Sequence, residues 1–181
     1  MLCIIESDLH GVDSRIKRNN SFTSNEIKEI LNIPGYNLIL PKSWDVHSQA
    51  RLLLFVHEKI QIKIRDNSRN NSDLPMITCD ISLGKEKKTI VNFFYREFKS
   101  GVSGLNNKNS QIERLKRMAQ IWTNLSKENR DLICMGDANV CNKLWNVDNY
   151  HLNDYINMIN KFLLDSSCQQ IIKEYTRFEK N

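Results

Sequence analysis

Hydrophobic and polar residues alternate along the chain in short blocks, a pattern that predicts strands interspersed with amphipathic helices. Runs that are apolar throughout or that alternate residue by residue predict strands at 2–5, 36–40, 51–56, 60–64, 76–83, 89–94 and 131–135. Apolar positions spaced three and four residues apart predict helices at 25–31, 112–125 and 152–163. Ser24 and Ser110 precede the first two helices and suit the N-cap position.

Polar segments separate these elements. Residues 8–20, 65–73 and 99–109 are polar or rich in Asn and Gly and predict loops, and Pro34-Gly35 predicts a turn. Because strands and helices alternate without an internal repeat or a linker, the pattern predicts one α/β domain over residues 1–181. No apolar run approaches the roughly 18 residues that a membrane helix needs, so no membrane partner is expected.

The number and spacing of the cysteines indicate the redox environment of the protein. The chain contains five Cys, none of them in a C-x-x-C pair. The odd count and wide spacing argue against a disulfide framework and against a zinc site. We therefore expect a reduced, intracellular protein in which each Cys acts as a small buried apolar residue.

Positive charge is concentrated in one part of the chain. The segment 85–117 has nine Lys and Arg against three Glu, a balance of +6, whereas the whole chain has a net charge of +5. A local basic stretch fits a polyanionic partner such as nucleic acid. A solvated helix face explains the charge equally well, and the charge pattern alone leaves both explanations open.

Polar side chains directly follow three of the predicted strands. Glu6 ends the first, and its carboxylate suits a hard cation such as Mg²⁺. Tyr95 and Arg96 end a middle strand, where a hydroxyl and a guanidinium can bind phosphate oxygens. Asp137 and Asn139 follow a late strand in Gly-Asp-Ala-Asn, for which Gly predicts a tight turn. This carboxylate can orient or deprotonate a water, and the amide can donate to a phosphate.

Taken together, these strand ends resemble the endonuclease/exonuclease/phosphatase superfamily. The order Glu6-Ser7, Tyr95-Arg96 and then residues 136–139 is similar to that of the apurinic-type endonuclease domains of non-LTR (LINE-type) retrotransposons. Trp145 and the Glu-Tyr-Thr-Arg run at 174–177 fit the same subgroup. The resemblance extends along nearly the whole chain.

The resemblance implies a fold and a reaction. The fold is a four-layer α/β sandwich, in which two mixed sheets pack face to face between helices. The reaction is Mg²⁺-dependent phosphodiester cleavage that nicks DNA. The resemblance further implies that Glu6 binds the metal, Tyr95 contacts the scissile phosphate, Asp137 activates the attacking water and Asn139 helps to position that water.

The resemblance also implies partners. Arg96 and three cations of the basic segment, Arg114, Lys116 and Arg117, would face the nucleic-acid backbone. In such an element the domain is fused to a reverse transcriptase and acts on chromosomal DNA, which implies a nuclear location. The sequence gives no indication of the oligomeric state or of a cleavage preference.

The chain departs from the family pattern at both ends. The family has an Asn-bearing strand before the Glu strand, and an Asp-bearing strand and a Ser-Asp-His motif after the segment that matches 174–177. The sequence given contains neither, so we expect an incomplete sandwich with exposed sheet edges and marginal stability. None of the four His is in a context that would replace the family's catalytic His.

Three functions therefore stay open at this stage. The first is a Mg²⁺-dependent DNA endonuclease. The second is a catalytically inactive, nucleic-acid-binding remnant of such a domain, which the absent His motif favours. The third keeps the superfamily but changes the substrate to a phosphorylated lipid or an RNA tail, and the basic segment argues mildly against it.

Overall fold

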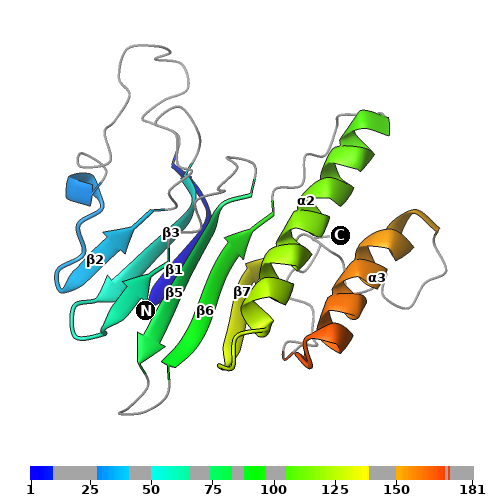
Figure 1. Ribbon diagram of the computed structural model, residues 1–181. Coiled ribbons are helices and arrows are strands. Elements are labelled where there is room, and N and C mark those ends of the chain that lie inside the picture. Colours follow the sequence, from blue (N-terminus) through cyan, green and yellow to red (C-terminus); the bar gives the residue numbers. More distant parts are fainter. Residues whose placement is uncertain are drawn as a thin grey trace, which may run out of the picture. The chain divides into compact units, whose positions relative to one another are not determined.

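The computed structural model describes residues 1–9, 28–40, 50–65, 74–82, 88–96, 105–138, 150–169 and 171. The strands among these residues are β1 (Leu2–Leu9), β2 (Tyr36–Ile39), β3 (Ala50–His57), β4 (Ile62–Ile64), β5 (Met76–Ser82), β6 (Lys88–Tyr95) and β7 (Leu132–Asp137). The longer helices are α2 (Leu105–Ser126) and α3 (Tyr150–Asp165) (Figure 1). The chain divides into two compact units, residues 1–97 with 130–138 and residues 98–129 with 139–181. Each unit is described separately below.

The first unit contains two sheets. In one, β3 lies between β1 and β2 and is antiparallel to both. In the other, the strand order is β4-β5-β6-β7, and the sheet is mixed because β6 and β7 are parallel whereas the other neighbours are antiparallel (Figure 1). These seven strands coincide with the runs that the sequence pattern predicted, although β1, β3, β6 and β7 extend beyond the predicted ends and β2, β4 and β5 are one or two residues shorter.

The core of this unit lies between the two sheets. Every second residue of β3, β5 and β6 points into it, as the alternating pattern of a strand requires. The fully buried members are Leu52, Leu54, Val56, Ile77, Cys79, Ile81, Val91 and Phe93. Two sheets that pack face to face, together with helices elsewhere in the chain, confirm the predicted α/β sandwich class.

On the other face of the three-stranded sheet, a small apolar cluster joins β3 to β2 and to the chain on either side of β2. Leu53 and Phe55 pack there against Leu31 and neighbouring leucines. The predicted turn at Pro34-Gly35 is present, with a φ of 79° at Gly35 and a hydrogen bond from the Tyr36 amide to the Ile33 carbonyl (3.0 Å). Pro followed by Gly with positive φ is the signature of a type II turn.

The second unit pairs α2 with α3. The rings of Trp122 on α2 and Phe162 on α3 lie 5.1 Å apart, and both side chains are buried. The hydroxyl of Ser166 donates to the Phe162 carbonyl (2.6 Å) where α3 ends. Among the described residues, no helix is long and apolar enough to cross a membrane.

Two predictions about α2 are wrong. The helix begins at Leu105, inside the predicted loop, so Ser110 lies within the helix and is not its N-cap. Arg114, which the helical pattern placed on the outer face with Lys116, is only 8% exposed. It is one helical turn from Met118, so its aliphatic stem extends the buried stripe that Met118 and Trp122 form. The prediction of a single domain over residues 1–181 is not tested by the two units and stays a prediction.

Candidate active site

The carboxyl ends of β6 and β7 bring two of the predicted site residues together. Tyr95, the last residue of β6, is the register partner of Asp137, the last residue of β7. Their parallel ladder continues one step further, because the amide of Arg96 donates to the Asp137 carbonyl (2.9 Å). Since parallel strands end at the same edge of a sheet, side chains that follow them can act on one ligand.

Gly136 has a different role from the predicted one. It lies within β7 and does not form a turn, because the strand continues through Asp137. A Cβ atom at position 136 would lie 1.9 Å from the carbonyl oxygen of Phe94 on β6. Glycine is therefore required for the close approach of two backbones, and this approach brings Asp137 beside Tyr95.

The three described side chains at this strand end differ in exposure. Tyr95 is 3% exposed and Arg96 is 2% exposed, whereas Asp137 is half-buried. The Nε atom of Arg96 donates a hydrogen bond to the Ala138 carbonyl. Asp137 is thus the most accessible of these groups, which suits a carboxylate that binds a water, and Arg96 is committed to the backbone just beyond it.

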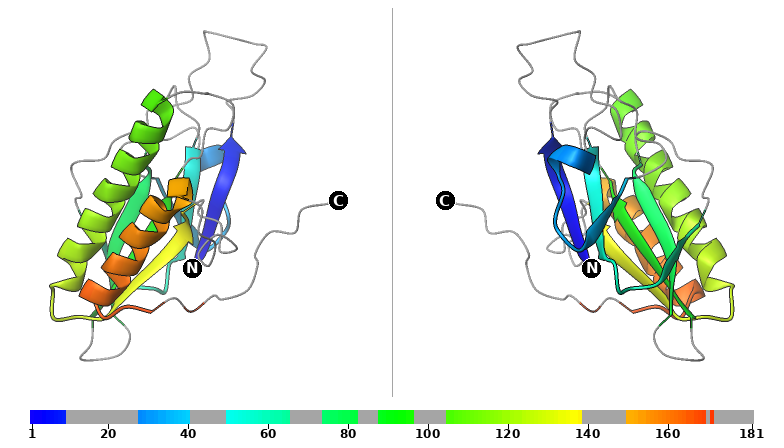
Figure 2. Two further views of the ribbon diagram at one scale, coloured as in Figure 1. Left: turned by 90° about the vertical axis from the view of Figure 1, so that its right-hand side faces the viewer. Right: turned by 90° about the vertical axis from the view of Figure 1, so that its left-hand side faces the viewer.

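Glu6 lies within β1, which continues to Leu9, so the prediction that Glu6 ends its strand is wrong. The pairing of β1 with β3 is regular from Leu2 to Ile5 and shifts between Ile5 and Leu9, so Glu6 falls in an irregular stretch of the strand. Figure 2 shows that β1 and β7 point in the same direction, so their carboxyl ends are at the same end of the two sheets. The structure describes the backbone of Glu6 and not its side chain. Asn139, Trp145 and residues 174–177 lie outside the described residues.

The basic residues of α2 belong to the second unit. Lys116 is exposed and Arg117 is half-buried, whereas Arg114 is buried. Of these three cations, Lys116 is thus the one whose exposure best fits a surface contact with phosphates. The prediction that the three face nucleic acid is not tested by the structure and stays a prediction.

The donor set at the strand ends is compatible with magnesium. Among the described side chains, no three His, Cys, Asp or Glu gather into a group that could enclose a metal ion. Mg²⁺ does not need such a cage, because it keeps several waters and is commonly held by one or two carboxylates. Asp137, half-buried at the strand end, fits this requirement, and Glu6 would supply the second carboxylate.

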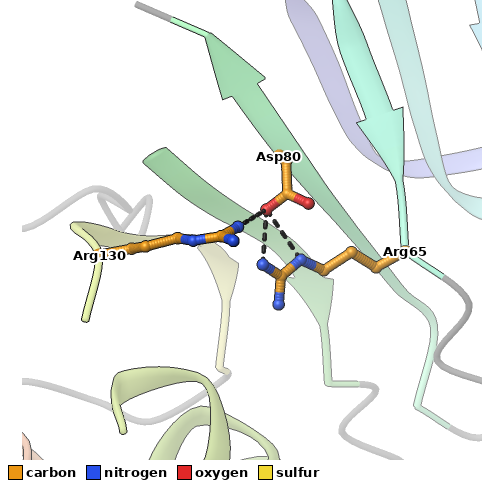
Figure 3. A network of polar contacts seen from close by, with 3 residues as sticks. All are labelled: Arg65, Asp80 and Arg130. Carbon is orange, nitrogen blue, oxygen red and sulfur yellow. Dashed lines mark hydrogen bonds and ion pairs between the residues drawn. The ribbon is translucent and has the colours of Figure 1, made fainter. Parts of the chain in front are cut away.

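A polar network that the sequence did not predict lies at the opposite end of the four-stranded sheet. The Oδ1 atom of Asp80 on β5 accepts hydrogen bonds from the Nε (2.9 Å) and Nη2 (2.6 Å) atoms of Arg65, which follows β4 (Figure 3). Arg130, just before β7, donates to the same oxygen from Nη1 (3.1 Å). Asp80 pairs in register with Ile90, near the start of β6, so this network is remote from Tyr95. It ties three strands together and suits a structural role.

The arginines set the ionisation of this network. Burial alone would raise the pKa of Asp80, but the hydrogen bond and charge of Arg65, with smaller effects from Arg130 and Lys63, lower it below its ordinary value of 3.8. Burial raises the pKa of the neighbouring Cys79 thiol to about 11. Cys79 is therefore a protonated core residue at neutral pH, as the sequence analysis expected, whereas Cys3, Cys134 and Cys168 are only half-buried.

A second buried polar pair lies in the middle of the sheet. The Nδ2 atom of Asn92 on β6 donates to the Oγ1 atom of Thr78 on β5 (2.8 Å), and both side chains are at most 2% exposed. Asn92 is the polar residue in an otherwise apolar run, and that is the signal from which sequence reasoning could have identified it. A hydrogen-bonded pair of this kind fixes strand register, because a shift of one residue would leave both groups unsatisfied.

Comparison with known proteins leaves the family open. No protein-family model matches the chain, and no curated protein matches it. A solved structure with a similar fold is the endonuclease domain of TRAS1, a telomere-specific non-LTR retrotransposon, at 13% sequence identity and a TM-score of 0.47. The match covers 72% of this chain and 53% of the other, so this chain spans about half the length of that domain. A likeness of this size carries no functional argument, and the proposal below depends on the residues themselves.

Proposed function

We propose that this chain is a Mg²⁺-dependent phosphodiester hydrolase domain that nicks DNA, of the kind found in non-LTR retrotransposons. The observation that carries the proposal is the pairing of Tyr95 with Asp137 at the shared carboxyl end of β6 and β7. The location of Glu6 on β1, which points the same way, supports it. Carboxylates and a hydroxyl at one end of a sandwich are the groups that hydrolysis of a phosphodiester needs.

Each residue is proposed to have one role. Asp137 is accessible enough to orient a water and accept its proton. Tyr95 is buried, so the contact of its hydroxyl with a phosphate oxygen would require the strand end to open locally. Glu6 would hold Mg²⁺, which when bound neutralises phosphate charge, and Asn139 would donate to the same phosphate. Lys116, the exposed cation among the three of α2, would provide a contact to the DNA backbone.

The proposal extends to the cellular setting through the resemblance of the strand-end residues to the retrotransposon family. A domain of this kind would be fused to a reverse transcriptase and would act on chromosomal DNA in the nucleus.

The test is nicking of supercoiled plasmid DNA with Mg²⁺, comparing the wild-type chain with Asp137→Asn. Because the amide cannot accept a proton, we expect the substitution to reduce the rate by about 100- to 10,000-fold, and EDTA to abolish nicking. The matched control is Asp131→Asn, an exposed carboxylate at the opposite end of β7, which should nick at the wild-type rate.

Three results would contradict the proposal. Nicking that survives in Asp137→Asn, or that needs no metal, would indicate a contaminant or another site. Salt-dependent DNA binding by a folded chain that never nicks would identify the inactive remnant instead. Cleavage of phosphorylated lipid or of RNA in preference to duplex DNA would keep the chemistry and replace the substrate.

A further inference from the structure

Arg96 makes two contacts with the residues that end β7. Its main-chain amide donates to the carbonyl of Asp137 (2.9 Å), and the Nε atom of its side chain donates to the carbonyl of Ala138. The two acceptors belong to consecutive peptide groups, one on each side of the Cα atom of Ala138. One residue thus fixes both the place where β7 stops and the direction of the chain directly after its catalytic candidate.

The burial of the Arg96 side chain makes these hydrogen bonds energetically important. The side chain is 2% exposed and is among the largest fully buried side chains of the described residues. Burying a guanidinium is unfavourable unless its donors are satisfied, so the carbonyl of Ala138 stabilises the arginine while the arginine restrains the carbonyl. The planar guanidinium presents its donors in fixed directions, which makes the restraint directional as well as strong.

This burial also bears on the phosphate contact that the sequence suggested for Arg96. A phosphate-binding arginine on a DNA-contacting surface needs its guanidinium accessible to the backbone. Arg96 is 2% exposed, so it has almost no accessible surface that a phosphate could contact.

We propose that Arg96 is a positioning residue, which holds Asp137 and Ala138 in the geometry for hydrolysis by hydrogen-bonding the two consecutive carbonyls of Asp137 and Ala138. This inference deepens the proposed function and depends on it for its catalytic consequence. The restraint itself belongs to the fold and can be measured whether or not the chain cleaves DNA.

The experiment compares Arg96→Lys with the wild-type chain and with Lys88→Gln. Lysine keeps the charge and loses the planar Nε donor. Lys88 is an exposed cation at the opposite end of β6 and serves as the matched control. Amide hydrogen exchange gives a readout independent of activity, because the amide at position 96 bonds to Asp137 whereas that of Ile90 bonds to Asp131 (2.8 Å) at the far end of the same ladder.

In Arg96→Lys, we expect exchange of the amide at position 96 to accelerate about tenfold relative to Ile90, as loss of a hydrogen bond to a charged group predicts. We expect kcat for nicking to fall about 100-fold, because small displacements of a reacting group are costly. KM and the slope of DNA affinity against salt concentration should stay at the wild-type values. Lys88→Gln should change neither the exchange ratio nor kcat.

Other results would overturn the proposal, and each points to a different role. If the slope of log DNA affinity against log salt concentration fell in magnitude by about 0.9 while kcat stayed unchanged, Arg96 would be a phosphate ligand. If amide exchange accelerated equally at positions 96 and 90, Arg96 would stabilise the fold as a whole and would not restrain the strand end in particular. Unchanged exchange would show that no restraint exists. If the wild-type chain does not nick, the proposed function fails, while the exchange ratio still decides whether Arg96 restrains the strand end.

Discussion

At the scale of single residues, Gly136 shows how closely the candidate site depends on backbone contact. The Phe94 carbonyl occupies the space where any other residue would place its Cβ, at 1.9 Å from that position. The obstacle is main chain, which cannot rotate away as a side chain can. The site therefore tolerates no side chain at the residue before Asp137.

We predict that Gly136→Ala separates β6 from β7 locally and moves Asp137. Overpacking of this kind typically costs about 1–3 kcal/mol of unfolding free energy, and a backbone obstacle places the cost at the upper end. Urea unfolding would measure it, and nicking should fall at the same time. Met135→Ala, which removes a half-exposed side chain from the same strand, is the control and should change stability by less than about 0.5 kcal/mol. A Gly136→Ala chain of wild-type stability would show that the strands can separate freely.

At the scale of elements, β7 is the last strand of its sheet among the described residues. Ile133 is 41% exposed and Met135 is 51% exposed, although their register partners on β6, Val91 and Phe93, are buried. An edge strand with exposed apolar side chains is a template for pairing with another chain.

We predict that Ile133→Lys reduces self-association, because a charge on an edge strand opposes strand pairing. Light scattering during storage at high protein concentration would measure the change. Leu164→Lys is the matched control, since Leu164 is 80% exposed and lies on a helix, α3, and not on a strand. Equal improvement in both variants would attribute the effect to net charge and exclude the edge as its cause.

The elements also show what the sequence could predict. Apolar runs and alternation identified every strand of the described residues, because a buried strand is apolar throughout and a half-buried strand requires a period of two. Tyr95 and Asp137 were correctly expected on or next to strand ends, whereas Glu6 lies inside β1. The start of α2 was missed, because the Asn-rich first turns resemble a loop. The role of Gly136 and the contact of Arg65 with Asp80 depend on how distant strands align. Local patterns do not specify that alignment, and neither of these features could be predicted.

At the scale of the whole molecule, the Asp80 network joins segments that are far apart in the chain. Arg65 lies 15 residues from Asp80, and Arg130 lies 50 residues from it. The carboxylate is well shielded, at 14% side-chain exposure, so salt screens these contacts less than it would on an open surface. Its ionisation therefore couples the stability of the four-stranded sheet to pH.

We predict a stability difference between the wild-type chain and Asp80→Asn that disappears in acid. The pKa of Asp80 is lower in the folded chain than its ordinary value of 3.8, so its contribution is fully present above pH about 4. That contribution is lost as the pH falls through the folded pKa. Urea unfolding from pH 2 to pH 7 would measure it, with Glu113→Gln, an exposed carboxylate on α2, as the control. A difference that stayed constant down to pH 2 would show that the charge of Asp80 is not the cause.

The contact between Arg96 and Ala138 closes a segment of 42 residues, and this has a consequence for the timing of folding. Antiparallel neighbours can pair early through short connections, but a parallel pair must wait until the intervening chain has been made and its ends have met by diffusion. During synthesis, Tyr95 leaves the ribosome well before its partner exists. The candidate active site is thus absent from the nascent chain until residue 138 has emerged, and β6 spends that interval with one edge open to chaperones or to aggregation.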